Sequence, residues 1–242
     1  LKTPLNIFAS SVQLLDSFSD GDKEEFVYKY KKHSPYLALN CKRMLRLINN
    51  IIDLTKIDVG MIKPNFGNYE IVSLIEEIAL SIIPYGMSKN IDIEFDTNVE
   101  EHYIKCDPNM IEKIVLNLLS NAIKYSKNNG YIKINLILES DIIRFIVSDN
   151  GIGIDEKIKG KIFDRFSRGD NSLNRLNEGS GVGLSIVKSM IDIHNGNVTV
   201  ESVLGKGSTF EVQLPNIKIE DELEEIYEYN RDKTVLELSD IY

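Results

Sequence analysis

Two amides and one ammonium are spaced so that they share one face of a predicted helix. Asn117, Asn121 and Lys124 stand at positions i, i+4 and i+7 of a segment predicted to be helical over residues 107–126, and its apolar residues project from the opposite side. Amide oxygens suit a hard cation such as Mg²⁺, and an ammonium suits phosphate oxygens. A solvated polar face has the same pattern, so this helix alone does not decide between the two.

A carboxylate stands at the end of a predicted strand. Asp149 has the same parity as Ile143 and Val147, so it extends an apolar face, and Gly151 and Gly153 follow directly. An aspartate in this place can accept a hydrogen bond from the exocyclic amine of adenine, while the glycines let the backbone pass close to the ring. Guanine has a carbonyl there and would be rejected. A common strand-ending Asp-Asn-Gly turn is the alternative.

A glycine-rich segment precedes another predicted helix, which runs over residues 183–194. Gly179, Gly181 and Gly183 lie at its start, and free backbone N–H groups at such a start bind phosphate oxygens. The dinucleotide fingerprint does not fit, because Leu184 stands where its last glycine belongs, and the P-loop spacing is absent. The glycines alone do not identify the ligand.

In order and spacing, these segments resemble the nucleotide-binding boxes of histidine kinases. The boxes are Asn117-Leu-Leu-Ser-Asn121-Ala-Ile-Lys124-Tyr125, Asp149-Asn-Gly151-Ile-Gly153, Phe163-Asp-Arg-Phe166 and Gly179-Ser-Gly181-Val-Gly183-Leu184. The opening Leu1-Lys2-Thr3-Pro4-Leu5 resembles the end of the family's phosphoacceptor box, so the resemblance covers residues 1 to about 215. It implies the fold that these kinases share with gyrase-type ATPases and heat-shock chaperones, with ATP under a mobile lid over roughly residues 155–180.

The resemblance also implies a role for each matched residue. Asn121 is the expected Mg²⁺ ligand with Asn117 beside it, and Asp149 is the expected reader of adenine. Arg168 matches an arginine that reaches the terminal phosphate in some relatives, and Thr3 matches a threonine that positions water for dephosphorylation. The full set expected to bind ATP is Asn117, Asn121, Lys124, Tyr125, Asp149, Gly151, Gly153, Gly179, Gly181, Gly183, Leu184 and Thr209.

What the resemblance implies for function is the cytoplasmic catalytic core of a sensor histidine kinase. Such a core moves the terminal phosphate of ATP to a stem histidine and then to an aspartate on a response-regulator receiver domain. In the family that histidine lies two residues before the leucine that is Leu1 here, so we expect the acceptor, like any membrane attachment, in an upstream region. Two alternatives are an ATPase clamp, which the helical stem disfavours, and a degenerate partner-binding module, which the intact Asn121 and Asp149 disfavour.

The first sixty residues are predicted to form two helices that position this machinery. Apolar residues repeat every 3.5 positions from Leu1 to Leu15 and again from Leu37 to Thr55. Pro35 either kinks the second helix or starts a new one with Ser34 as its cap. Because two helices cannot cover their own apolar stripes, we expect a homodimer through a four-helix bundle.

From about residue 67, predicted helices alternate with strands rich in β-branched residues. The expected fold class is α+β, with an N-terminal helical hairpin followed by an α/β sandwich that has a mixed, largely antiparallel sheet. The expected divisions are a dimerisation and phosphotransfer stem over 1–66, a catalytic ATP-binding domain over 67–215 and an acidic tail over 216–242.

The net charge of −9 argues against a nucleic-acid surface, which needs clustered Lys and Arg. Two cysteines are too few for a disulfide framework or a zinc site, and no apolar run is long enough for a membrane span. Residues 216–242 carry nine acidic and three basic residues. In this tail we expect a surface helix over 220–229 and a short edge strand over 235–238, both outside the catalytic fold.

Overall fold

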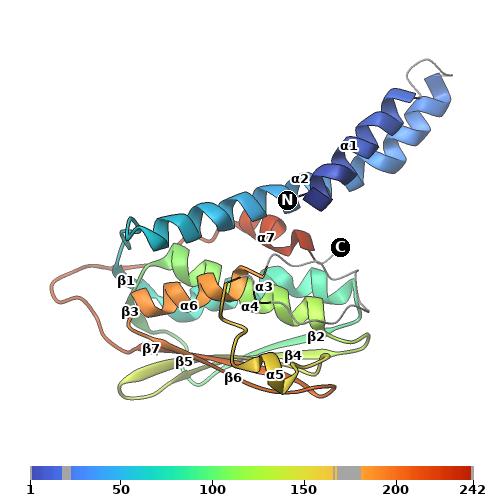
Figure 1. The fold of residues 1–242 in the computed structure, drawn as a ribbon. Helices are drawn as coiled ribbons and strands as arrows, with labels where there is room; N and C mark the ends of the chain where they lie inside the picture. Colours follow the sequence, from blue (N-terminus) through green and yellow to red (C-terminus); the bar gives the residue numbers. More distant parts are fainter. Residues whose placement is uncertain (1, 18–22, 166, 168–180, 241–242) are drawn as a thin grey trace.

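A computed structural model describes residues 2–17, 23–165, 167 and 181–240, and shows a helical stem joined to an α/β domain (Figure 1). The stem consists of α1 (Lys2–Ser17) and α2 (Lys23–Asp58), which form the predicted hairpin. Pro35 lies inside α2, so no new helix starts there. Figure 1 shows that α2 changes direction where it leaves α1 and then lies across the α/β domain. None of the helices described in the chain is long and apolar enough to cross a membrane.

The main sheet has five strands in the order β2-β4-β5-β7-β6. Their bounds are β2 (Asp92–Thr97), β4 (Tyr131–Leu138), β5 (Ile142–Asp149), β6 (Asn197–Val203) and β7 (Gly207–Pro215). Among the described strands of this sheet, only β2 and β4 pair in parallel, which confirms the mixed, largely antiparallel sheet. In β4 and β5 buried residues alternate with less buried ones, because successive side chains point to opposite faces.

Three helices cover one face of this sheet: α3 (Ile71–Met87), α4 (Pro108–Tyr125) and α6 (Gly183–Ile193) (Figure 1). The helix α4 starts as predicted, because Oδ1 of Asp107 accepts the N–H groups of Asn109 and Met110 at 3.0 and 3.3 Å and Pro108 occupies the first turn. Almost every residue of α4 is buried. It is therefore the rigid element from which the site is built.

The tail does not have the predicted structure. Instead of a surface helix over 220–229 it forms β8 (Glu224–Glu225), which joins β3 (Tyr103–Cys106) and β1 (Gly67–Glu70) in a small sheet. Instead of an edge strand over 235–238 it forms the helix α7 (Arg231–Glu237) and a 3-10 turn, η1 (Leu238–Asp240). Figure 1 shows α7 between α2 and the helices of the domain.

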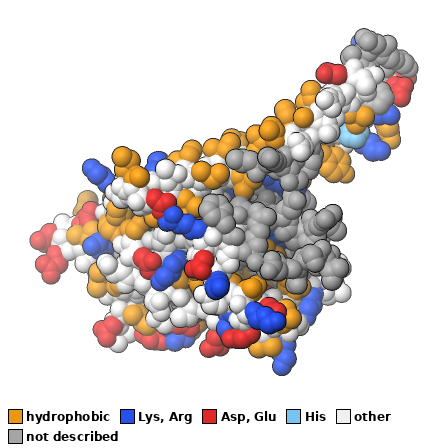
Figure 2. All heavy atoms as spheres, viewed as in Figure 1, with side chains coloured by type: hydrophobic (Ala, Val, Ile, Leu, Met, Phe, Trp, Pro, Cys, Tyr) orange, Lys and Arg blue, Asp and Glu red, His pale blue; other side chains and the backbone are white. Residues whose placement is uncertain are grey.

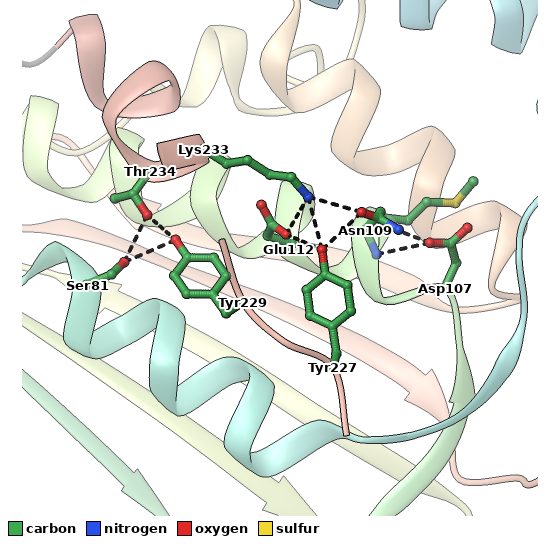
Figure 3. A network of polar contacts seen from close by, with 9 residues as sticks. Ser81, Asp107, Asn109, Glu112, Tyr227, Tyr229, Lys233 and Thr234 are labelled. Atoms are coloured by element: carbon green, nitrogen blue, oxygen red, sulfur yellow. Dashed lines mark hydrogen bonds and ion pairs between the residues drawn. The ribbon is translucent and has the colours of Figure 1, made fainter. Parts of the chain in front are cut away.

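Polar contacts from the tail to α3 and α4 explain this difference (Figure 3). Glu112 of α4 is buried, and its Oε2 accepts hydrogen bonds from the Tyr227 hydroxyl at 2.8 Å and from Lys233 Nζ at 2.9 Å. The Tyr229 hydroxyl shares hydrogen bonds with Ser81 of α3 and Thr234 of α7. Polar groups of Tyr227, Tyr229 and Lys233 thus hold the segment on the domain, while its apolar Leu223 and Ile226 stay exposed.

His194, at the end of α6, ties that helix to the start of α4. Its Nε2 accepts the backbone N–H of Asp107 at 3.0 Å, so the proton lies on Nδ1, which donates to the Met190 carbonyl at 2.7 Å. Burial lowers the pKa of His194 below its ordinary value of 6.5. The folded protein therefore keeps the ring neutral at a pH where the unfolded chain already binds a proton.

This arrangement predicts that stability falls as the pH drops below about 6.5, by up to about 1.4 kcal/mol per pH unit for this one group. Above 6.5 the ring is neutral in both states, so the contribution is complete there. His194→Gln should flatten the slope of unfolding free energy against pH, measured by urea unfolding between pH 7.5 and 5. His33→Gln, on the stem, controls for the loss of a histidine elsewhere. An unchanged slope in His194→Gln would refute the assignment.

Candidate functional site

A cavity of about 110 Å³ opens between α4, the start of α6 and the stem helix α2. Most of its lining comes from residues that the sequence singled out on α4 and at the glycine-rich segment. The lining residues are Arg46, Asn50, Asn117, Ser120, Asn121, Lys124, Tyr125, Ile162, Ser167, Gly181, Gly183 and Leu184. The predicted amide face and the predicted glycine-rich helix start are therefore two walls of one cavity.

The amide face of α4 is fixed by contacts within the helix and with α6. Asn117 is buried, and its Nδ2 donates to the Lys113 carbonyl one turn earlier at 2.9 Å. Its Oδ1 faces Gly183, where a Cβ atom would come within 2.6 Å, so only glycine fits there without displacing the amide. The amide of Asn121, also on the cavity wall, has no hydrogen-bond partner among the described residues. It is the amide available to a ligand.

Lys124 brings a positive charge to the same wall. Its side chain is only 8% exposed, and its Nζ lies 5.5 Å from the centre of the Tyr125 ring. An ammonium held in so buried a place attracts an anion strongly, because little water screens it. The helix face thus offers one cation and at least one unpaired amide to the cavity.

The opposite wall is the start of α6, which begins at Gly183. The residue before it, Val182, provides no side-chain cap, and the first described helical hydrogen bond runs from Ile186 N–H to the Val182 carbonyl at 3.1 Å. The backbone N–H groups of the first turn therefore point toward the cavity end of the helix, and no side chain among the described residues caps them. Together with the helix dipole, such N–H groups suit phosphate oxygens.

Asp149 ends β5 beside this cavity. Its Oδ1 accepts the Gly151 N–H at 2.8 Å, and burial raises the pKa of Asp149 above its ordinary value, while hydrogen bonds from the Gly151 and Ser208 backbones oppose the rise. Gly151 packs against the end of α4, because a Cβ atom there would lie 2.3 Å from the Tyr125 carbonyl. The Ile152 N–H donates to that same carbonyl at 3.0 Å. The carboxylate is thus locked to the helix that carries the amides.

Several predicted residues lie apart from this arrangement. Thr209 neighbours Ser208 in β7, but its hydroxyl pairs with Ser148 Oγ at 3.1 Å and not with Asp149. Gly153 lies just beyond the Asp149 turn, at a φ of +66° and against the backbone of Val203. Arg168, Gly179 and Phe166 lie outside the described residues, as does the Thr3 side chain, so their roles stay predictions.

The structure describes only the first part of the predicted lid. It contains the short helix α5 (Glu156–Lys159) and then Ile162 and Ser167, which reach the cavity. Phe163 lies edge-on to Phe210 of β7, with ring centres 6.4 Å apart, which anchors this part to the sheet.

Two cavity residues, Arg46 and Asn50 of the stem helix, were not predicted. Both are buried, and with Leu54 they stand at i, i+4 and i+8 on the face of α2 that lies against the domain. Further contacts hold this face in place, since Lys113 of α4 pairs with Asp53 and Arg165 Nη1 donates to Asp58 at 2.6 Å. The sequence alone gave no signal for these two residues, because their burial depends on how α2 packs on the domain.

The comparisons with known proteins agree with this geometry. Residues 106–218 match the family described as "Histidine kinase-, DNA gyrase B-, and HSP90-like ATPase". Sensor histidine kinase WalK of Bacillus subtilis (strain 168) is 31% identical over 223 residues, which is 89% of this chain and 35% of WalK. The chain therefore spans about a third of the length of this curated relative.

Solved structures extend the agreement to the fold. The catalytic domain of histidine kinase ThkA is 30% identical, with a TM-score of 0.56 over 63% of this chain and 97% of that one. Histidine kinase ThkA in complex with the response regulator protein TrrA has a TM-score of 0.65 over 89% of this chain and 58% of that one. At 23% identity, the second match concerns the fold alone, but it includes the stem.

Proposed function

The chain belongs to the sensor histidine kinase family, and from this premise we propose that it binds magnesium-ATP in the cavity between α4 and α6. We propose further that the terminal phosphate passes to a stem histidine and then to an aspartate on a response-regulator receiver domain. The observation that carries the proposal is the convergence of Asn121 and Lys124 with the uncapped start of α6, beside the half-buried Asp149.

Each group has a task that its position supports. The N–H groups at Gly183 and the ammonium of Lys124 bind phosphate oxygens, and Asp149 accepts a hydrogen bond from the adenine amine. Phosphoryl transfer needs little covalent help from the protein, since positioning and charge neutralisation supply most of the catalysis. The bond from the terminal phosphorus to the bridging oxygen breaks, a phosphorus–nitrogen bond to the imidazole forms, and ADP leaves.

The amide oxygens in the cavity fit magnesium, which prefers hard oxygen ligands. Asn121 would hold it, and Asn117 lies one turn away with its Oδ1 toward the start of α6. When bound, Mg²⁺ supplies positive charge between the phosphate oxygens. The role of the chain is to present these amides on a rigid, buried helix.

None of the three histidines in residues 1–242 fits the acceptor role. Both ring nitrogens of His194 are engaged in hydrogen bonds within the buried interior. His102 Nε2 pairs with Asn216 Oδ1 at 2.7 Å, beside the small sheet. His33 lies in the stem hairpin near Leu14, away from the cavity residues. We therefore propose that the acceptor is outside these residues.

The following experiment tests the proposed function. Residues 1–242 are compared with a copy extended at its start so that a histidine stands two positions before Leu1, both in magnesium and terminally labelled ATP. We expect acid-labile, alkali-stable label on the extended copy alone, and none on the extended copy that also carries Asp149→Asn. Label of this kind on residues 1–242 themselves, or on the Asp149→Asn copy, would contradict the proposal.

A homodimer through the stem belongs to the same proposal. The outer face of α2 exposes Leu45, Ile48 and Ile52, and α1 exposes Leu5 and Phe8. Figure 2 shows hydrophobic side chains in a band along the stem. Apolar stripes of this kind support pairing with a second hairpin in a four-helix bundle. A cytoplasmic position and attachment through an upstream membrane segment stay predictions from the resemblance.

A further inference from the structure

We propose that Arg46 and Asn50 of the stem helix are ligand-binding residues of the nucleotide site, at its phosphate end, and that they favour a magnesium-bound nucleoside triphosphate over a diphosphate. This inference rests on the proposed function, because it assumes that the cavity holds a nucleotide. It adds the stem of the same chain to a site otherwise built from the catalytic domain.

The first argument is the inverted polarity of α2. Arg46 and Asn50 are 7% and 2% exposed, while Leu45 on the outer face is 53% exposed. A helix that only had to pack on the domain would bury its leucines and isoleucines, because burial of polar groups is unfavourable unless they find partners. The buried polar side chains instead line the cavity with Asn121 and Lys124.

The second argument is the unpaired oxygen of Asn50. Among the described residues, its Oδ1 is fully buried and accepts no hydrogen bond. A buried amide oxygen without a donor indicates an absent partner, which here must be a hydrogen-bond donor or a cation. Phosphate oxygens are acceptors and do not qualify. Magnesium or a water molecule bound to it does, and the amides of Asn117 and Asn121 line the same cavity.

The third argument is the way in which the tail holds Arg46. Its Nε donates to Glu237 Oε2 of α7 at 2.7 Å, and both side chains are at most 10% exposed. Glu237 is itself fixed, since its backbone carbonyl accepts a hydrogen bond from Ser120 Oγ of α4 at 3.3 Å. The guanidinium is thus preorganised at the cavity edge, and its planar fork suits phosphate oxygens better than an ammonium does.

The position of Arg46 and Asn50 determines which phosphate of the nucleotide they contact. The cavity includes Gly181 and Gly183 at the phosphate-binding helix start, whereas Asp149 at the adenine end is not among its lining residues. Arg46 and Asn50 therefore lie at the end of the site farther from adenine. The terminal phosphate of a triphosphate, with its charge and its magnesium, reaches these two residues. A diphosphate lacks that phosphate and makes fewer contacts with them.

Calorimetric titration of residues 1–242 with magnesium-ATP and magnesium-ADP tests the inference. Arg46→Met keeps a long side chain but removes its charge, and Asn50→Leu keeps the shape of the side chain but removes its amide. We expect each variant to bind ATP roughly 10-fold or more weakly, with less than about a threefold change for ADP. Arg46→Lys should recover part of the loss. The Asn50→Leu defect should disappear when magnesium is chelated.

Matched controls separate ligand binding from docking of the stem. Arg43→Met removes the contact from Arg43 Nε to the Ser239 carbonyl, at 2.9 Å, on the same helix but outside the cavity lining. Asn49→Leu changes the exposed neighbour of Asn50. Both should bind ATP and ADP as the parent does, and circular dichroism should show the same helix content in all variants.

The outcomes distinguish this inference from the proposed function. The inference would be overturned if Arg46→Met and Asn50→Leu bound ATP with unchanged affinity. It would also be overturned if they lost affinity for ATP and ADP equally and Arg43→Met showed the same loss. If Asp149→Asn still weakens ATP binding in that case, the nucleotide site stands and only the stem contribution fails. If Asp149→Asn also binds ATP normally, the proposed function itself fails.

Discussion

Asp149→Asn should lower the affinity for ATP by roughly 100-fold, because it removes a charge-assisted hydrogen bond worth about 1.5–3 kcal/mol and directs amide donors at the donors of adenine. The loss should approach the upper end of that range, since Asp149 is half-buried and the asparagine leaves the adenine donor facing another donor. The fold should persist, because an asparagine oxygen can still accept the Gly151 N–H. Calorimetric titration with magnesium-ATP measures the effect.

Asp141→Asn is the matched control, since Asp141 precedes the other end of the same strand, β5, and is exposed. It should bind ATP as the parent chain does. GTP should bind weakly to the parent, because its carbonyl would face the Asp149 carboxylate. Equal ATP affinity in the Asp149→Asn and Asp141→Asn variants would show that Asp149 does not bind adenine.

Asn121→Ala should weaken magnesium-ATP binding by at least about 10- to 100-fold. Losing a residue that only supports a metal ligand already costs about this much, and Asn121 is proposed to be a ligand itself. The reason is that Asn121 carries the cavity amide that has no partner among the described residues and is the proposed ligand for magnesium. When magnesium is removed by a chelator, the parent chain and the variant should bind ATP with nearly the same affinity. Titration of both proteins with and without magnesium measures the difference.

The control for this change is Asn128→Ala, just beyond the end of α4, where the side chain is exposed. It should leave affinity unchanged in both conditions. A loss in Asn121→Ala that persists at the same size without magnesium would show that the amide contacts the nucleotide directly, and the metal assignment would be wrong.

Much of the site could be predicted because it depends on local sequence. The start of α4 follows from Asp107 and Pro108, which form a cap and a first turn whatever surrounds them. The position of Asp149 follows from the alternation along β5, and that of Gly183 from the helix it begins. In each case residues within one element determine where the side chain points.

The contribution of the stem could not be predicted in this way. Arg46 and Asn50 lie between the positions of the apolar repeat, and only the packing of α2 on the domain shows that their face is the buried one. The prediction treated the stem as an apolar dimer seam, which assigned no role to these two polar residues. Burial of these two residues depends on contacts such as Arg46 with Glu237, 191 positions apart in the chain.

The tail was predicted wrongly for a related reason. Tyr227 has helical spacing with Leu223 and Ile226, but its hydroxyl group binds Glu112 on α4, and the hydroxyl group of Tyr229 binds Ser81 on α3 (Figure 3). Such tertiary contacts override weak local preference. Charge was also misleading, because an acidic segment looks solvated until its lysine is seen to pair with Glu112.

The most direct test of the central claim is the structure of this chain bound to magnesium and a non-hydrolysable ATP analogue. We predict the adenine amine within hydrogen-bond distance of Asp149, the phosphates at the start of α6 and the metal on Asn121, with Arg46 toward the terminal phosphate. A nucleotide bound elsewhere, or one whose adenine avoids Asp149 and whose phosphates avoid the start of α6, would contradict the account.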